Sequence, residues 1–413
     1  MESSIMAGNN LTRIISWIDY RYPVSQFLKE HMSGYYAPKN FNFWYYFGAL
    51  SLVVLVNQLG TGIWLAMSYN PSAEGAFASV EYIMRDVNFG WLLRYMHAVG
   101  ASFFFIVVYL HMFRALLYGS YRKPRELVWI VGMFIFLCLM AEAFFGYLLP
   151  WGNMSFWGAQ VITSLFGAIP FIGDSLVEFI RGDYNISGVT LNRFFALHVV
   201  LVPLVFVGLV GFHILSLHHV GSNNPDGIDI KKHKDANGKP LDGIPFHPYY
   251  TVKDTFGLAV FFILFAVVVF FMPDFFGLFL EAPNFIPADP LKTPEHIAPV
   301  WYMTPYYAIL RAIPNKLLGV IAMGMSIMLF FFLPWLDRSP VKSIRYKGWM
   351  CKTALTLFVI SFLCLGYLGT QQPTNIKTLC AQICATFYFS FFVFMPIYTK
   401  FDKNKPEPER VTN

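Results

Sequence analysis

Residues 97–111 read HAVGASFFFIVVYLH, with a histidine at each end of thirteen residues that carry no charge. An α-helix rises about 1.5 Å and turns about 100° per residue, so His97 and His111 share one face, roughly 21 Å apart along the axis. Burying a polar group costs free energy unless it finds a bonding partner. The stretch therefore predicts a helix that presents two imidazoles to partners at two depths of an apolar environment.

The composition of the whole chain is that of a polytopic membrane protein. Of the 413 residues, 56 % are hydrophobic and only 13 % are charged, and the mean hydropathy is +0.51. A bilayer core about 30 Å thick needs about 20 apolar residues per helical crossing. We expect an all-α integral membrane protein with eight transmembrane helices, at 43–67, 91–117, 127–149, 190–217, 256–276, 317–336, 349–369 and 378–399.

The basic residues concentrate on one side of these helices. They are frequent in the N-terminal segment and in the second, fourth and sixth connections, and sparse in the odd-numbered connections. The positive-inside rule then places both termini in the cytoplasm. The net charge of +6 follows from this topology and does not indicate a nucleic-acid partner. We expect a multi-pass protein surrounded by membrane lipids, with no cleavable signal at its start.

The chain divides into five expected parts. In residues 1–42, a cytoplasmic segment, Leu11, Ile14, Ile15 and Ile18 recur at helical spacing, which favours an amphipathic surface helix over a disordered arm. The other parts are a four-helix bundle at 43–217 with connecting helices at about 150–190, a cytoplasmic connection at 218–255, a C-terminal four-helix part at 256–399 and a cytoplasmic tail at 400–413. The five cysteines fall within expected spans, so we expect packed thiols and no disulfide.

The fourth expected span also contains two histidines, His198 and His213, which are fifteen residues apart. Because the second and fourth spans cross the membrane in the same direction, His97 is level with His198 near the outer surface and His111 is level with His213 nearer the cytoplasm. A single intramembrane histidine is readily explained by a bond to a neighbouring helix. Four histidines paired by level predict two bis-imidazole sites, one above the other.

Haem iron is the metal that suits such sites. We expect no cysteine or carboxylate at either level, which leaves zinc two ligands short, whereas axial ligation of haem iron needs only two imidazoles. The macrocycle also needs space between helices. Two glycine pairs supply it at a spacing of fourteen residues, in the first and third spans: Gly48 and Gly62, and Gly132 and Gly146. The first four helices are expected to form a di-haem bundle with two non-covalent b-type haems.

Two arginines extend this arrangement. Arg94 lies three residues before His97, and Arg114 lies three residues after His111. At these positions a guanidinium could pair with haem propionates. The alternative is that both side chains simply extend to the membrane interface.

Several blocks of the chain resemble cytochrome b of the bacterial cytochrome bc complex, the quinol:cytochrome c oxidoreductase. The blocks follow the order of that family and cover almost the whole chain: GYLLPWGNMSFWGAQVIT (146–163), NRFFALH (192–198), GSNNPDG (221–227), PYYTVKD (248–254) and PVWYMTPYYAILRAIPNKLLG (299–319). The resemblance implies an outer low-potential haem ligated by His97 and His198, and an inner high-potential haem ligated by His111 and His213.

The resemblance also implies the reaction and its setting. Ubiquinol is oxidised at an outer site, one electron passes to a Rieske iron–sulfur protein and on to a cytochrome c1-type subunit, and the other crosses the membrane to quinone at an inner site. Protons are released outside and taken up inside. The expected setting is a homodimeric respiratory complex in the bacterial inner membrane.

The family's quinone sites map onto two groups of residues. The outer site corresponds to Tyr147, Gly158, Pro299, Trp301, Tyr302 and Tyr307. The inner site corresponds to His218, Ser222, Lys253 and Asp254, with His219 expected to be interfacial. A histidine and a carboxylate at opposite ends of a quinone ring suit paired proton delivery. Simple packing is the alternative explanation for the outer aromatic residues.

The sequence departs from the family pattern in two places. The second histidine pair is separated by fifteen residues, where fourteen is common, and a local distortion near Pro203 could absorb the extra residue. Val300 stands where the family motif PEWY has a glutamate that is thought to accept a proton from quinol. Glu142 in the third span is a candidate to take over that role, because a carboxylate in a membrane span indicates function. A structural hydrogen bond is the alternative for Glu142.

Two other classes of protein deserve comparison. A transporter with intramembrane histidines explains the polar residues but not the matching glycine spacing. The haem-anchoring subunit of a membrane dehydrogenase explains the histidines but has no use for the PVWY segment at 299–302 or for the spans after it. A reduced-minus-oxidised visible spectrum separates the transporter from both haem proteins.

Overall fold

The computed structural model describes residues 10–29 and 34–412. Within these ranges, eight helical segments are long and apolar enough to cross a membrane: Phe43–Ala66, Gly90–Tyr118, Glu126–Leu148, Gly188–Val220, Phe246–Phe271, Lys316–Leu336, Trp349–Thr370 and Asn375–Val393. Each overlaps one of the eight expected spans, so the expected all-α membrane architecture is confirmed.

The fifth span differs most from its expected bounds. We expected it at 256–276, but the helical segment runs over Phe246–Phe271. Lys253 and Asp254 therefore lie on the helix and not in the connection before it. Long polar side chains in the first turns of a membrane helix can extend to the interface, so the helix continues through them. A search for apolar runs alone therefore starts the helix too late. His218 is likewise on a helix, because the fourth span continues to Val220.

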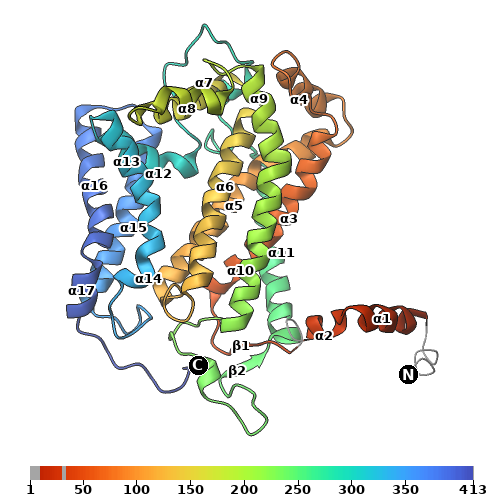
Figure 1. Cartoon of the computed structure of the whole chain (residues 1–413), viewed down its shortest axis with the longest axis vertical. Helices are drawn as coiled ribbons and strands as arrows, with labels where there is room; N and C mark the ends of the chain where they lie inside the picture. Colours follow the sequence, from red (N-terminus) through yellow and green to blue (C-terminus); the bar gives the residue numbers. More distant parts are fainter. Residues whose placement is uncertain (1–9, 30–33, 413) are drawn as a thin grey trace.

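Four long helices form a bundle (Figure 1). The helix α3 packs against α5, and α6 packs against α10. Their bounds are Tyr46–Ala66 for α3, Gly90–Tyr118 for α5, Glu126–Leu148 for α6 and Val202–Val220 for α10, which continues from α9 (Gly188–Ala196). The helix α5 ends at Tyr118, and the next residue, Gly119, has a φ of 64° in the left-handed region that favours glycine.

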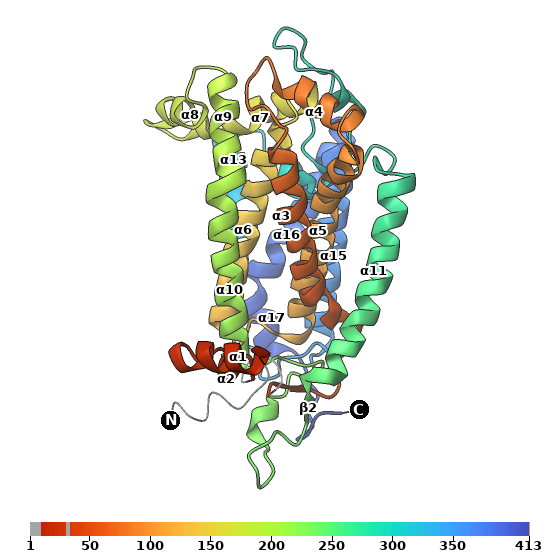
Figure 2. The same ribbon diagram turned by 90° about the vertical axis from the view of Figure 1, so that its right-hand side faces the viewer.

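A second group of helices stands beside this bundle. Here α15 packs against α12 and α16, and α13 also contacts α12. Their bounds are Thr304–Ala312 for α12, Lys316–Met328 for α13, Trp349–Thr370 for α15 and Asn375–Val393 for α16. The remaining long helix, α11 (Thr251–Phe271), contacts α3 and α5 and lies on the outside of the bundle (Figure 2).

The short elements gather at the two ends. The end that carries α7 (Asn153–Leu165) also carries α4 (Ala76–Arg85) and α8 (Gly173–Arg181), and we call it the α7 end (Figure 1). The opposite end, the α1 end, carries the exposed helix α1 (Asn10–Arg21) and the C-terminal tail. Further elements are α2 (Val24–Leu28), α14 (Leu333–Leu336), α17 (Met395–Phe401) and a two-stranded antiparallel sheet of β1 (Tyr36–Pro38) and β2 (Gly243–Pro245).

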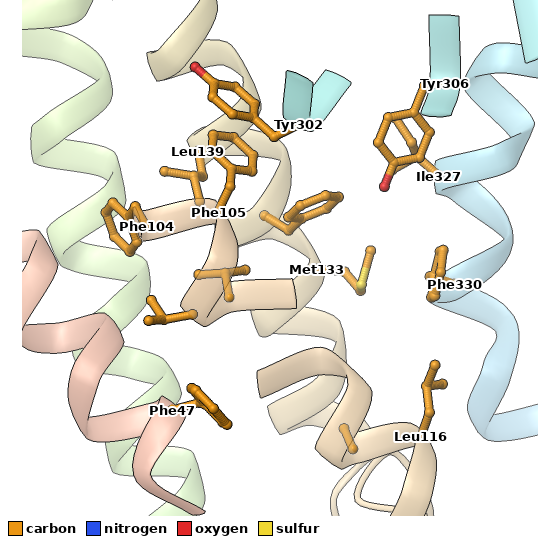
Figure 3. Close-up of a cluster of buried hydrophobic side chains, with 14 of the residues drawn as sticks. Phe47, Phe104, Phe105, Leu116, Met133, Leu139, Tyr302, Tyr306, Ile327 and Phe330 are labelled. Atoms are coloured by element: carbon orange, nitrogen blue, oxygen red, sulfur yellow. The ribbon is translucent and has the colours of Figure 1, made fainter. Parts of the chain in front are cut away.

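Aromatic and aliphatic side chains fill the seam between the two groups of helices (Figure 3). The rings of Phe105 and Tyr302 stack with centroids 3.8 Å apart. Trp129 Nε1 donates to the Phe330 carbonyl at 2.7 Å. This bond joins α6 to the segment that follows α13.

Asp226 joins four separate segments at the α1 end. Its fully buried carboxylate accepts hydrogen bonds from Asn40, Arg345, Tyr346 and Thr412 at 2.8 to 3.0 Å. The aspartate belongs to the GSNNPDG block, whose turn presents it. This contact set fastens the C-terminal tail beneath the helices.

Candidate functional site

The first histidine pair lies toward the α7 end. The imidazole centroids of His97 and His198 are 6.1 Å apart, with the rings at 89°. Thr61 Oγ1 donates to the Asn57 carbonyl and lies 2.9 Å from His97 Nδ1, which assigns the donor role to that ring nitrogen. His198 Nδ1 lies 2.9 Å from the Glu142 carbonyl. In both rings Nε2 is left as the nitrogen available to a metal.

A second histidine pair lies toward the α1 end. The imidazole centroids of His111 and His213 are 6.4 Å apart. Arg114 Nη2 lies 3.2 Å from His111 Nδ1. The buried Nε atom of Arg114 has no hydrogen-bond partner among the described residues. A buried, incompletely bonded guanidinium beside a metal-ligand pair suits an anionic group such as a carboxylate. Arg94, by contrast, is half-buried one turn before His97.

Each imidazole faces one of the four predicted glycines. A Cβ atom on Gly48 would lie 3.2 Å from His111 Cε1, on Gly62 3.1 Å from His97 Cε1, and on Gly132 3.2 Å from His213 Cε1. On Gly146 it would overlap the His198 ring. The pairing by level agrees with the sequence: Gly62 and Gly146 face one histidine pair, and Gly48 and Gly132 face the other.

A π-helical segment absorbs the extra residue between His198 and His213. It covers Leu197–Leu201 and joins α9 to α10. A π-turn places one more residue in the turn than an α-helix, so fifteen residues span the distance that fourteen span in α5. Pro203 follows in the first turn of α10. The expected distortion near Pro203 is therefore present, and it includes His198 itself.

One expectation about these levels is wrong. We expected no carboxylate at either level, but Glu142 Oε1 lies 3.0 Å from His198 Nδ1. The reason is that α6 packs against the helix of His198, so a residue four positions before Gly146 reaches the same ring. This carboxylate meets Nδ1 and leaves Nε2 free. Among the described residues there is no group of three or more histidine, cysteine, aspartate or glutamate side chains that could hold a metal ion.

The donor set fits a haem at each level. Two imidazoles that each place a nitrogen about 2 Å from one metal ion have ring centres about 6 Å apart. The observed separations of 6.1 and 6.4 Å agree with this geometry. The pairs thus suit the two axial positions of haem iron and no larger ligand set.

A cavity of about 280 Å³ lies near the α7 end, between α6, α7, α12 and α13. Tyr147, Gly158, Pro299 and Tyr307, four of the residues predicted for the outer site, line it together with Val300. The rest of its wall is apolar apart from one further phenol. The walls suit a flat, mostly apolar ring with hydroxyl or carbonyl groups.

Three predicted outer-site residues do not line this cavity. Trp301 Nε1 donates to Ser102 Oγ at 3.0 Å, and Tyr302 stacks on Phe105. These contacts hold the PVWY segment against α5. Glu142 faces His198. A residue that sequence reasoning missed is Glu281, whose Oε2 accepts a hydrogen bond from Tyr147 at 3.0 Å. No local pattern identifies it, because it lies in an irregular connection far from Tyr147 in sequence.

At the α1 end the predicted inner-site residues fall into two groups. Tyr35 joins His218 and Ser222: its ring stacks on His218 with centroids 4.5 Å apart, and its hydroxyl lies 2.7 Å from Ser222 Oγ. Lys253 on α11 lies with its Nζ 4.4 Å from the centre of the Tyr249 ring. Asp254 is half-buried beside it. No pattern in the sequence identified Tyr35 as a member of this group.

Comparisons with known proteins agree with this geometry. The family model "Cytochrome b/b6/petB" matches residues 32–221, and the model "Cytochrome b(C-terminal)/b6/petD" matches residues 287–389. Cytochrome b of Allochromatium vinosum is 60 % identical over 410 residues, which cover 97 % of this chain and 99 % of that protein. The chain belongs to the cytochrome b family.

Two further relatives and one solved structure extend this comparison. Cytochrome b of Rickettsia bellii is 51 % identical, and the match covers 96 % of each chain. A "Cytochrome b/c1" of Bradyrhizobium diazoefficiens is 46 % identical over 96 % of this chain and 56 % of that longer protein. A chain of a hyperthermophilic respiratory complex III superposes with a TM-score of 0.86 at 40 % identity, covering 94 % of this chain and 98 % of that one. This cytochrome b is a homologue of the complex III subunit.

Proposed function

We propose that this cytochrome b is the haem b-carrying, quinol-oxidising and quinone-reducing subunit of a respiratory bc complex. The observation that carries the proposal is the pair of bis-histidine sites, with ring centroids 6.1 and 6.4 Å apart, at two levels of the same two helices. Haem bound at each level would supply one-electron redox chemistry at two depths of the membrane. The chain would then act as the catalytic subunit of a quinol:cytochrome c oxidoreductase.

The side chains around each histidine pair would set the orientation of the ligands. The Nδ1 atom of His97 bonds Thr61, and the Nδ1 atom of His198 bonds the Glu142 carbonyl. These bonds would fix the orientation of each ring and leave its Nε2 atom free for a metal. Arg114 would pair with a propionate beside His111. The four glycines let α3 and α6 approach the imidazoles closely.

The cavity near the α7 end is the proposed quinol-oxidation site. Its apolar wall would hold the ring, and the Tyr147 and Tyr307 phenols would bond the ring oxygens. Tyr147 is adjacent in sequence to Gly146, the glycine that meets the His198 ring. The cavity wall is therefore adjacent to the outer histidine pair. This proximity would suit electron transfer from quinol in the cavity to a haem at that pair.

The proposed quinone-reduction site lies at the α1 end. His218, Ser222, Lys253 and Asp254 would bind the quinone there. Tyr35, which stacks on His218 and meets Ser222, would form one side of the site. A histidine and a carboxylate near one quinone can each deliver a proton to a ring oxygen.

The membrane orientation and partners complete the proposal. The basic connections lie at the α1 end, so this end would face the cytoplasm and the α7 end the outer side of a bacterial inner membrane. The partners would be a Rieske iron–sulfur protein and a cytochrome c1-type subunit in a homodimeric complex. The haem bundle at 43–217, the connection at 218–255 and the C-terminal part at 256–399 would each keep the role expected from the sequence.

Purification of the complex from its native membrane tests this function. We expect an iron–sulfur protein and a c-type cytochrome to co-purify with the chain, and the preparation to reduce cytochrome c with ubiquinol. A preparation that contains the chain with both haems but does not oxidise quinol would contradict the proposal.

A further inference from the structure

The proposed outer cavity lacks the carboxylate that the family motif places on its wall. Val300 lines the cavity at that position. The polar groups on the wall are phenols, and one of them is already bonded to an acid: Tyr147 donates from its hydroxyl to Glu281 Oε2 at 3.0 Å. A carboxylate therefore lies behind the cavity wall and is connected to the cavity through the hydroxyl group of Tyr147.

The segment around Glu281 is held firmly in place. Glu281 directly precedes the short helix η8 (Ala282–Phe285). Within that helix, Asn284 Oδ1 accepts a hydrogen bond from the Ser155 N–H at 2.9 Å. The next residues pair with the start of α7, because the Asn153 N–H donates to the Ile286 carbonyl at 2.9 Å. The segment that carries Glu281 is thus fixed to α7 by hydrogen bonds, and these bonds hold Glu281 beside Tyr147.

The surroundings of Glu281 suit a general base. Burial raises the pKa of its carboxyl above the ordinary value, and the hydrogen bond from Tyr147 offsets only part of this increase. The ionisable groups that face it are two phenols, Tyr147 from α6 and Tyr302 from the turn before α12. Within the described residues no cation forms an ion pair with it. A carboxylate whose pKa is raised in this way binds a proton more readily than a fully solvated carboxylate.

Glu142 is less suited to this role. Its carboxylate lies 3.0 Å from His198 Nδ1 and does not line the cavity. Its position supports orientation of the axial ligand, which is a different task. Of the two carboxylates near the outer site, Glu281 is the one bonded to the cavity wall.

We propose that Glu281 accepts, through Tyr147, a proton that quinol releases in the cavity near the α7 end. The proposal rests on the proposed function, which supplies quinol as substrate and the one-electron acceptors of a bc complex as oxidants. As electrons leave for those acceptors, the quinol O–H bond breaks and its proton moves to the Tyr147 oxygen. The Tyr147 O–H bond breaks in the same step, and its proton moves to Glu281 Oε2. Tyr147 is unchanged, and Glu281 becomes a neutral carboxyl that then loses its proton to water at the α7 end.

Glu281→Gln tests this relay in the intact purified complex. The amide oxygen can still accept the Tyr147 hydrogen bond, but it cannot take up a proton. We expect ubiquinol:cytochrome c turnover to fall by about 100-fold at pH 7, the lower end of the range for loss of a general base. Glu281→Asp should retain part of the rate. Glu295→Gln, an exposed carboxylate of the same connection, is the matched control and should keep the full rate.

Two further measurements separate proton transfer from structural damage. The wild-type rate should rise with pH as Glu281 ionises, whereas the Glu281→Gln rate should lose this dependence. Redox-induced infrared difference spectra should contain a protonated carboxyl band in wild type that is absent in the variant. Val300→Glu in the Glu281→Gln background should restore turnover at least several-fold, because it returns a carboxylate to the cavity wall.

The possible failures are distinguishable. If the wild-type complex does not oxidise ubiquinol, the proposed function is wrong. If wild type is active and the Glu281→Gln complex, with both haems bound, matches its rate and pH profile, Glu281 is not the proton acceptor. If turnover falls but the pH profile and the carboxyl band remain as in wild type, Glu281 has a structural role only, and the relay is wrong.

Discussion

At the scale of single residues, a glycine opposite each histidine explains how two ligand sites fit in one bundle. A Cβ at Gly62 or Gly132 would stand 3.1 or 3.2 Å from an imidazole carbon, closer than ordinary van der Waals contact. Any larger side chain must displace the ring or the neighbouring helix. The glycines therefore set how closely α3 and α6 can approach the histidines.

We expect Gly132→Leu to lose the haem held by His111 and His213, and Gly62→Leu to lose the haem held by His97 and His198. Each variant keeps all four ligands, so the cause would be steric. Haem content and visible spectra of membranes that contain the variant chain measure this. Gly208→Leu, on α10 with open space at its Cβ position, is the matched control. Normal haem content in both variants would show that the glycines serve helix packing alone.

The sequence predicted these residues because their spacing is a property of one helix. The fourteen-residue spacings of His97 and His111 and of the glycines are visible without any knowledge of neighbours. Thr61, Tyr35 and Glu281 were not predicted, because each acts through a partner that only the fold brings near. Glu142 was singled out as an acid within a membrane span, but its contact with His198 depends on how α6 packs against the segment Gly188–Val220.

At the scale of elements, the π-helical segment Leu197–Leu201 lets His198 and His213, which are fifteen residues apart, face the two histidines of α5, which are fourteen apart. The sequence indicated that a distortion was needed but not where it lies, because proline and several glycines nearby are all able to produce one. The widened turn faces away from the helix bundle at Val200, whose side chain is 55 % exposed.

Deletion of Val200 should therefore be tolerated. The spacing from His198 to His213 then becomes fourteen, as between His97 and His111, so a regular α-helix can keep both histidines on one face. We expect both haems to be retained. Insertion of one alanine after Val200 is the opposite change and should remove at least one haem, because it rotates His198 by about 100° relative to His213. Haem loss in the deletion and retention in the insertion would contradict this account.

The contact set of Asp226 is a second feature at this scale. Burial acts to raise the pKa of this carboxyl, but hydrogen bonds from Thr412, Tyr346 and Arg345 outweigh it and hold the pKa below the ordinary value. A lowered pKa in the folded state means that the stabilisation is present above the unfolded pKa of about 3.9 and is lost as the pH falls through the folded value.

We expect Asp226→Asn to release the C-terminal tail, at a cost of roughly 1–3 kcal/mol for the lost charge-assisted bonds. Limited proteolysis of the tail at pH 7 measures the release, and the thermal midpoint of the complex measures the cost. Glu409→Gln, an exposed change in the same tail, should leave both unchanged. Equal protection of the tail in the two variants would show that Asp226 does not anchor it.

At the scale of the whole molecule, the chain combines a four-helix bundle that carries the histidines with a second group of helices that closes the outer cavity. Composition and apolar runs predicted the eight crossings, because the bilayer fixes helix length. They did not predict the seam between the groups, in which Trp129 bonds the Phe330 carbonyl and Tyr302 stacks on Phe105. Such contacts depend on irregular backbone and aromatic geometry that no periodicity encodes.

The central claim is that the chain holds two haems, each between one histidine of α5 and one histidine of the helical segment Gly188–Val220. Redox-titrated visible spectra of His97→Leu, His198→Leu, His111→Leu and His213→Leu test it most directly. The account predicts two b-type components in wild type, with one lost in both His97→Leu and His198→Leu and the other lost in both His111→Leu and His213→Leu. Loss of the same component in His97→Leu and His111→Leu, or a wild-type spectrum without b-type bands, would contradict it.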